Sequence, residues 1–201
     1  MSLNCNEIDK IISELNLEGS FIQEVVQPNF NSIALYTYKP GSPKTIFISL
    51  EAGACRICET RRKITKNEKP LRFNEMLKSK IKGARILSCA QIGKDRIIRI
   101  ELEKAGAIYV MPQAQEHATK KAKSMQTDDE DEFFFLYIRL WSNAGNIFLC
   151  DKNNLILDSF YRRPAKGEKT GEILALPEEK ALSESENVAM TEKFPVRDFS
   201  E

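Results

Sequence analysis

The stretch Arg85-Ile-Leu-Ser-Cys-Ala-Gln-Ile-Gly-Lys-Asp-Arg-Ile-Ile-Arg-Ile-Glu-Leu-Glu103 holds the pattern that decides the fold. In its second half, Ile98, Ile100 and Leu102 alternate with charged side chains. A period of two with one apolar face is typical of a half-buried β-strand. Gly93 can adopt the positive φ that a chain reversal needs. We therefore predict two antiparallel strands joined by a tight turn at residues 93–95.

Asp95 and Arg96 stand side by side where the second of these strands begins. An acid next to a guanidinium can orient it while the guanidinium still presents donors outward. From this segment alone, the pair is more simply interpreted as an ordinary turn residue and a surface ion pair, which contributes little to stability. The functional interpretation remains open beside it.

On both sides of this hairpin, the sequence predicts short strands and two helices. Apolar residues at helical spacing predict helices over 4–17, with Gly19 just beyond its end, and over 73–81. Strands are predicted at 21–28, 32–38, 45–50, 56–60, 133–141, 146–151 and 155–160. Short strands joined by short turns predict an antiparallel α+β fold.

Composition divides the chain into a main domain and a tail. We assign residues 1–177 to one domain, with a polar and acidic insertion near 113–132, and residues 178–201 to a tail or linker. The only histidine, His117, lies in the insertion, and so does the acidic run 128–132, which is typical of a solvated segment. We predict no metal site there.

Charge and hydropathy bear on two questions, namely whether the partner is a polyanion and whether the chain enters a membrane. Residues 56–104 carry 15 basic and 6 acidic side chains, which is compatible with a polyanionic partner and equally with Lys and Arg that only solvate the surface. No apolar run approaches the roughly 18 residues of a membrane helix. The start of the chain has neither the basic nor the apolar region of a signal peptide. We therefore expect no membrane span and a cytoplasmic protein.

The five cysteines do not predict a metal or redox site. An odd number of cysteines in a chain of this size without an export signal indicates reduced thiols. Cys55 and Cys58 form a lone C-x-x-C on a predicted strand, where positions i and i+3 face opposite sides. We find no nucleophile and base that would form a catalytic pair, so we expect neither enzymatic activity nor a cofactor.

Several motifs in register resemble the amino-terminal domain of the NFACT family, whose bacterial members are often named fibronectin/fibrinogen-binding proteins. The most specific is Gln91-Ile-Gly-Lys-Asp-Arg-Ile-Ile-Arg-Ile100, which is similar to the family's Q-x-G-x-D-R-I-x-x-I stretch. It is accompanied by Gln27-Pro28-Asn29, by Arg56-Ile57 and by the pair of strands at 146–151 and 155–158. The segment Arg139–Asn143 departs from the family pattern.

This resemblance implies a fold and a function. The fold would be an antiparallel β-sandwich with flanking helices, similar to the amino-terminal domain of formamidopyrimidine-type DNA glycosylases. The amino-terminal Pro-Glu that those enzymes use is absent, so their activity is not carried over. The family implies a ribosome quality-control factor that binds tRNA and the large ribosomal subunit carrying a stalled nascent chain. Asp95 and Arg96, and more weakly Arg56, would contact the nucleic acid. The alternative, from the family's older names, is an adhesin for fibronectin or fibrinogen.

Overall fold

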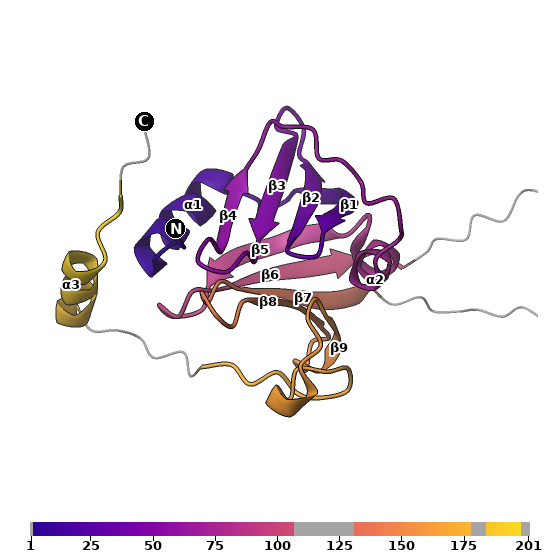
Figure 1. Ribbon diagram of the computed structural model, residues 1–201. Helices are drawn as coiled ribbons and strands as arrows, with labels where there is room; N and C mark the ends of the chain where they lie inside the picture. Colours follow the sequence, from indigo (N-terminus) through magenta and orange to yellow (C-terminus); the bar gives the residue numbers. More distant parts are fainter. Residues whose placement is uncertain (1, 107–130, 178–183, 198–201) are drawn as a thin grey trace, which may run out of the picture.

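A computed structural model of the chain describes residues 2–106, 131–177 and 184–197 (Figure 1). The predicted insertion, including His117, lies outside these residues except for 131 and 132. The helices and strands, in chain order, are α1 (Cys5–Leu15), β1 (Phe21–Asn29), β2 (Ser32–Tyr38), β3 (Lys44–Ser49), β4 (Arg56–Glu59), α2 (Arg72–Ile81), β5 (Arg85–Gln91), β6 (Ile97–Lys104), β7 (Glu132–Arg139), β8 (Asn146–Cys150), β9 (Ile156–Ser159), a 3-10 turn (Pro164–Lys166) and α3 (Glu184–Lys193). The predicted strands are confirmed, with ends that shift by one or two residues.

The strands form one antiparallel sheet in the order β4-β3-β2-β1-β5-β6-β7-β8-β9. Its two halves are joined between β1 and β5 through the single pair Phe21 and Arg85, whereas the neighbouring strand pairs run in longer register. Because the junction is so short, the halves can turn away from each other, and Figure 1 shows β1–β4 standing over β5–β9. The predicted α+β fold with two antiparallel layers is confirmed, with the refinement that the layers are one continuous hydrogen-bonded sheet.

The core lies between these two layers. Ile33 and Ile48 from the first half and Ile100 and Ile138 from the second belong to one buried cluster, and none is more than 1% exposed. Burial of each such side chain contributes roughly 1.5–3 kcal/mol. The alternation in β6 that the sequence shows is what places Ile98, Ile100 and Leu102 on this inner side.

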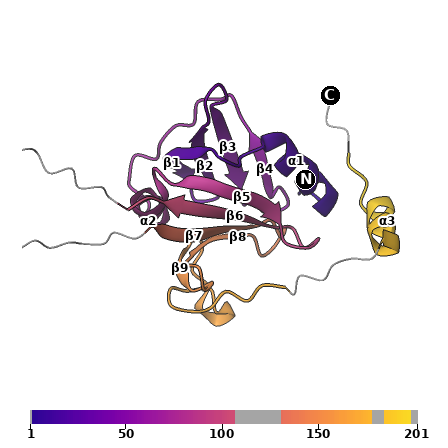
Figure 2. The ribbon, with the colours of Figure 1, turned by 180° about the vertical axis from the view of Figure 1, so that it is seen from behind.

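Helices α1 and α2 lie at opposite ends of the sheet, as Figures 1 and 2 show from two sides. Helix α1 begins with a capping box, in which the Asn4 side chain accepts a hydrogen bond from the Glu7 N–H (3.0 Å) and the Glu7 carboxylate accepts one from the Asn4 N–H (2.8 Å). Gly19, expected just beyond the end of a helix over 4–17, does not cap α1, which ends at Leu15. Asn16 takes the left-handed conformation instead (φ 43°), which asparagine tolerates, and Gly19 turns the chain into β1.

The segment assigned to the tail contains α3, which lies on the same side of the molecule as α1 in Figures 1 and 2. The side-chain amide of Asn6 donates to the main-chain oxygens of Met190 (3.2 Å) and Phe194 (2.7 Å), and that of Asn4 donates to the Pro195 oxygen (2.9 Å). The end of the described chain is therefore attached to the first helix. Within the described residues, no helix is both long and apolar enough to cross a bilayer.

Candidate nucleic-acid interface

The turn between β5 and β6 is tightly held by backbone hydrogen bonds. The Ile92 N–H donates to the Ile97 oxygen (2.8 Å) and the Asp95 N–H donates to the Ile92 oxygen (3.3 Å). Two residues take positive φ, Gly93 (52°) and Arg96 (56°). The sequence predicted this for Gly93 only. A left-handed conformation costs a residue with a Cβ about 1–2 kcal/mol, so the surrounding structure must hold Arg96 there.

Residues after β7 hold Arg96 in this conformation through hydrogen bonds to the main chain of the turn. The Leu140 N–H donates to the main-chain oxygen of Arg96 (2.9 Å), and the indole N–H of Trp141 donates to that of Asp95 (2.7 Å). The Arg139 guanidinium lies over the Trp141 ring, 4.6 Å from its centroid. The backbone of the Asp95-Arg96 pair is thereby fixed from a segment more than forty residues away in the sequence.

We expect Trp141→Phe to lower the free energy of unfolding by about 1 kcal/mol, because it removes the indole donor and keeps an aromatic ring for Arg139. Urea unfolding followed by circular dichroism measures this loss. Phe135→Leu, which removes a partly buried ring that makes no hydrogen bond to the turn, serves as a comparison. A Trp141→Phe protein whose β5–β6 amides exchange as slowly as the wild type would contradict a role in holding the turn.

The side chains of Asp95 and Arg96 do not pair. The carboxylate of Asp95 is exposed, and the described residues include no ion pair between it and Arg96. The proposed mutual orientation is therefore not found; with Arg96 in the left-handed region, the main-chain contacts to Leu140 and Trp141 hold the turn instead. Arg96 is half-buried. Burial raises the pKa of the Cys55 thiol, and the positive charge of Arg96 acts against this rise, which places Arg96 in the neighbourhood of Cys55.

Arg96 lines a cavity of about 610 Å³ beside the amino terminus of α1. The other lining residues come from 2–5 and 193–197, with Gly53, Lys94 and Ser142. Four lining residues are cationic, namely Lys94, Arg96, Lys193 and Arg197, and no Asp or Glu is among the lining residues. The α1 amino terminus adds a partial positive charge. We name this hollow the cationic cavity.

Two of these cations are already engaged. Lys94 pairs with Asp9 of α1, and Arg197 holds Glu7 through both carboxylate oxygens (2.5 and 2.6 Å). Arg197 also donates to the Ser2 oxygen (2.9 Å). Hydrogen bonding from Arg197 lowers the pKa of the buried Glu7 from 4.5 to about 2, against the effect of burial. For Arg96, the described residues offer no hydrogen-bonding partner to its guanidinium.

The three residues singled out from the sequence separate in the structure. Arg96 lines the cationic cavity, but Asp95 and Arg56 do not. Arg56 is exposed at the start of β4, where its charge and a hydrogen bond oppose the burial that raises the pKa of Cys58. Sequence reasoning missed Lys193 and Arg197, which carry no motif and reach the cavity from the far end of the chain.

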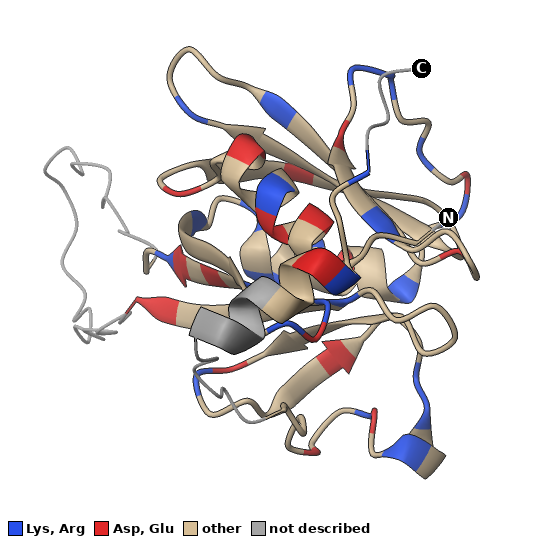
Figure 3. Ribbon diagram, turned by 90° about the vertical axis from the view of Figure 1, so that its left-hand side faces the viewer, with Lys and Arg blue, Asp and Glu red and all other residues tan. Residues whose placement is uncertain are grey.

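In the view onto the α1 side, basic and acidic residues are mixed on the helices (Figure 3). The surface around the cavity is therefore not uniformly basic. The positive charge at the cavity comes from the residues that line it. The five cysteines are free thiols. In the described part of the chain, no three His, Cys, Asp or Glu residues gather as a metal site would require.

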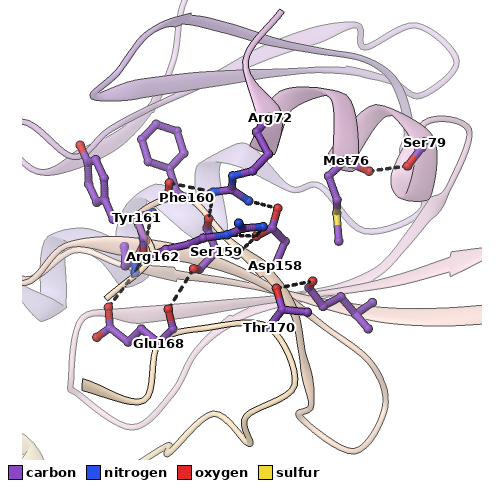
Figure 4. A network of polar contacts seen from close by, with 12 residues as sticks. Arg72, Met76, Ser79, Asp158, Ser159, Phe160, Tyr161, Arg162, Glu168 and Thr170 are labelled. Carbon is purple, nitrogen blue, oxygen red and sulfur yellow. Dashed lines mark hydrogen bonds and ion pairs between the residues drawn. The ribbon is translucent and has the colours of Figure 1, made fainter. Parts of the chain in front are cut away.

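A second polar cluster fixes α2 and the segment after β9 (Figure 4). Asp158, 3% exposed, pairs with Arg72 of α2 and with Arg162 (3.3 Å). Glu168 is also buried; its carboxylate accepts hydrogen bonds from Arg139 and from Asn146 (2.8 Å). Burial alone would raise the pKa of Glu168, but these hydrogen bonds lower it below its ordinary value. Buried and largely satisfied, this cluster serves the fold.

Comparison with known proteins is consistent with this architecture. A family model described as NFACT N-terminal and middle domains matches residues 6–180. The search of curated proteins finds no match. Among solved structures, the fibrinogen binding protein from Staphylococcus aureus is 18% identical to this chain, with a TM-score of 0.70. The aligned part covers 89% of this chain and 57% of the Staphylococcus aureus chain.

Two streptococcal structures are similar to the same extent. The N-terminal part of the fibronectin/fibrinogen-binding protein from Streptococcus suis is 19% identical with a TM-score of 0.74. The N-terminal domain of the fibronectin-binding protein PavA from Streptococcus pneumoniae is 18% identical with a TM-score of 0.73. Each alignment covers 94% of this chain and 68% of the other. At this identity the likeness establishes the fold alone, and the present chain spans about three fifths to two thirds of these structures.

Proposed function

We propose that this chain, which belongs to the family of NFACT N-terminal and middle domains, binds RNA at the cationic cavity beside the Asp95-Arg96 turn. The observation that carries the proposal is the lining of that cavity, where Arg96 and Lys193 form no ion pair with a described residue and no Asp or Glu is among the lining residues. The RNA would be tRNA, bound as part of a cytoplasmic ribosome quality-control factor that also engages the large ribosomal subunit. The role is binding and not catalysis.

Arg96 is the residue best placed to contact the RNA. Its guanidinium offers several donors in a fixed fork, which matches a phosphate or a base edge bidentately. The main chain of the turn that carries it is held by Leu140 and Trp141, so little backbone freedom is lost on binding. Lys193 then adds a second charge at the same cavity, whereas the charge of Lys94 is already paired with Asp9.

We expect Arg96→Ala to weaken tRNA binding by about 5- to 150-fold at 0.1 M salt, the loss of one charged bidentate contact of roughly 1–3 kcal/mol. Labelled tRNA titrated with the chain across a salt series measures both affinity and salt slope, and the slope should fall by about one. Arg61→Ala is the matched control, because Arg61 is exposed in the same basic segment and does not line the cavity.

The outcomes separate local recognition from bulk charge. If Arg61→Ala weakens binding as much as Arg96→Ala, net charge and not the cavity carries the affinity. If the chain fails to bind tRNA both alone and together with large ribosomal subunits, the proposal is wrong. A borohydride-trapped adduct with damaged DNA would overturn the non-catalytic role.

Binding to fibronectin or fibrinogen is the second candidate, because the three similar structures carry those names. Surface plasmon resonance on immobilised fibronectin and fibrinogen tests it directly. Saturable binding that persists in Arg96→Ala and at high salt would favour this role over RNA binding.

A further inference from the structure

The far end of the described chain forms one wall of the cationic cavity. This wall is the segment 190–197, which we name the strap and which comprises the last turn of α3 and the four residues after it. The residues of the strap that line the cavity are Lys193, Phe194, Pro195 and Arg197. The cavity measures about 610 Å³ with the strap in place. The strap therefore encloses this space and does not fill it.

Two side chains in the first turn of α1 hold the strap by hydrogen bonds. The Asn6 amide donates to the main-chain oxygens of Met190 (3.2 Å) and Phe194 (2.7 Å). The Glu7 carboxylate accepts from the main-chain N–H of Arg197 (3.2 Å) as well as from its guanidinium. Asn6 carries no charge and is not itself one of the described residues that line the cavity. Its contacts with the strap are therefore its route to the cavity.

Apolar packing contributes little to this attachment. All side chains of the strap are exposed or half-buried, and Val196 is 44% exposed. The two hydrophobic clusters found among the described residues include no side chain of the strap. A segment that is held by a few hydrogen bonds and buries little apolar surface opens locally at a low cost in free energy. The strap therefore has the features of a segment that docks reversibly.

We propose that reversible docking of the strap regulates the cationic cavity, which binds RNA tightly when the strap is docked and weakly when the strap is released. The inference rests on the proposed function and adds the regulation of that site. Release takes Lys193 and Arg197 away from the cavity. It also leaves the Glu7 carboxylate without its guanidinium partner, so a negative charge near the cavity is no longer compensated. Both changes disfavour a polyanion.

The test releases the strap in the 201-residue chain without changing a charge or a residue that lines the cavity. Asn6→Ala removes both hydrogen bonds to the strap and keeps α1, because alanine is the best helix former. Hydrogen exchange of the Arg197 amide, followed by NMR, reports docking, since this amide donates to Glu7. We expect this exchange to be at least about fivefold faster in Asn6→Ala. Binding of tRNA at 0.1 M salt should be at least about threefold weaker.

A matched control and two further measurements separate docking from bulk charge. Ser13→Ala, an uncharged substitution at an exposed position of α1, should change neither exchange nor affinity. In the wild type, saturating tRNA should slow exchange of the Arg197 amide at least about threefold, because the coupling between docking and binding is reciprocal. Lys193→Ala should weaken tRNA binding in the wild type and much less in Asn6→Ala, since Lys193 reaches the cavity from the docked strap.

The outcomes distinguish failure of the regulation from failure of RNA binding itself. A wild-type chain that binds no tRNA would overturn the proposed function and this inference together. Wild-type affinity for tRNA in a folded Asn6→Ala whose Arg197 amide exchanges faster would overturn the regulation alone, and tighter binding would show that the strap inhibits. Unchanged exchange of the Arg197 amide in Asn6→Ala would show that the strap is not held as proposed.

Discussion

Glu168→Ala is expected to lower the free energy of unfolding by about 3–5 kcal/mol, the range for removing one partner of a buried ion pair. The Glu168 carboxylate accepts hydrogen bonds from Arg139 and Asn146 (2.8 Å) and lies 3.4 Å from a guanidinium nitrogen of Arg163. Arg139 is itself only 8% exposed. Without the carboxylate, its charge stays buried with no counter-ion, although the Ala144 oxygen still accepts from its Nε (2.9 Å).

Urea unfolding at pH 7 measures this loss, and a neighbouring carboxylate supplies the control. Glu172 pairs with Lys169 (3.3 Å), but both side chains are about half exposed, so Glu172→Ala should change stability by no more than about 0.5 kcal/mol. Glu168→Ala/Arg139→Met should be more stable than Glu168→Ala, because the unpaired charge is removed as well. Equal losses for Glu168→Ala and Glu172→Ala would show that the buried cluster is not stabilising.

The fold was accessible from sequence because its determinants are local and periodic. In β6, the alternation of Ile98, Ile100 and Leu102 with charged residues marks both the strand and its buried face. In α1, the 3–4 spacing of isoleucines and the Asn4–Glu7 capping box lie within a few residues of each other. No sequence pattern indicates the bend between the two halves of the sheet, because the bend depends on how few residues of β1 and β5 pair with each other.

The candidate site was only partly accessible. Arg96 was found because it belongs to a motif that resembles a family, and it does line a cavity. Its positive φ and the absence of an ion pair with Asp95 depend on Leu140 and Trp141, which no local pattern connects to the turn. The contact between Glu7 and Arg197 spans 190 residues and leaves no periodic signal. Long-range polar contacts of this kind require the three-dimensional structure.

That contact leads to the second large prediction, which concerns pH. Glu7 is 2% exposed, and its pKa falls from 4.5 to about 2 mainly through the hydrogen bond from Arg197. A carboxyl group with a lowered pKa in the folded state stabilises the fold above its unfolded pKa and loses that contribution as the pH falls. The difference of roughly 2.5 pKa units corresponds to at most about 3 kcal/mol, and we expect about 2–3 because the Arg197 side chain is 30% exposed.

The wild type should therefore exceed Glu7→Gln in stability by about 2–3 kcal/mol at pH 7, and the difference should shrink as the pH falls from about 4.5 to about 2. Urea unfolding across this pH range measures it, with Glu14→Gln, an exposed substitution on the same helix, as the control. A difference that does not change with pH would assign the loss to packing and not to ionisation. Because Arg197 also lines the cationic cavity, protonation of Glu7 removes the anchor of one cavity wall. RNA binding at the cavity should then weaken in Glu7→Gln at pH 7 although no cation has been removed, an effect that a purely charge-driven interaction would not show.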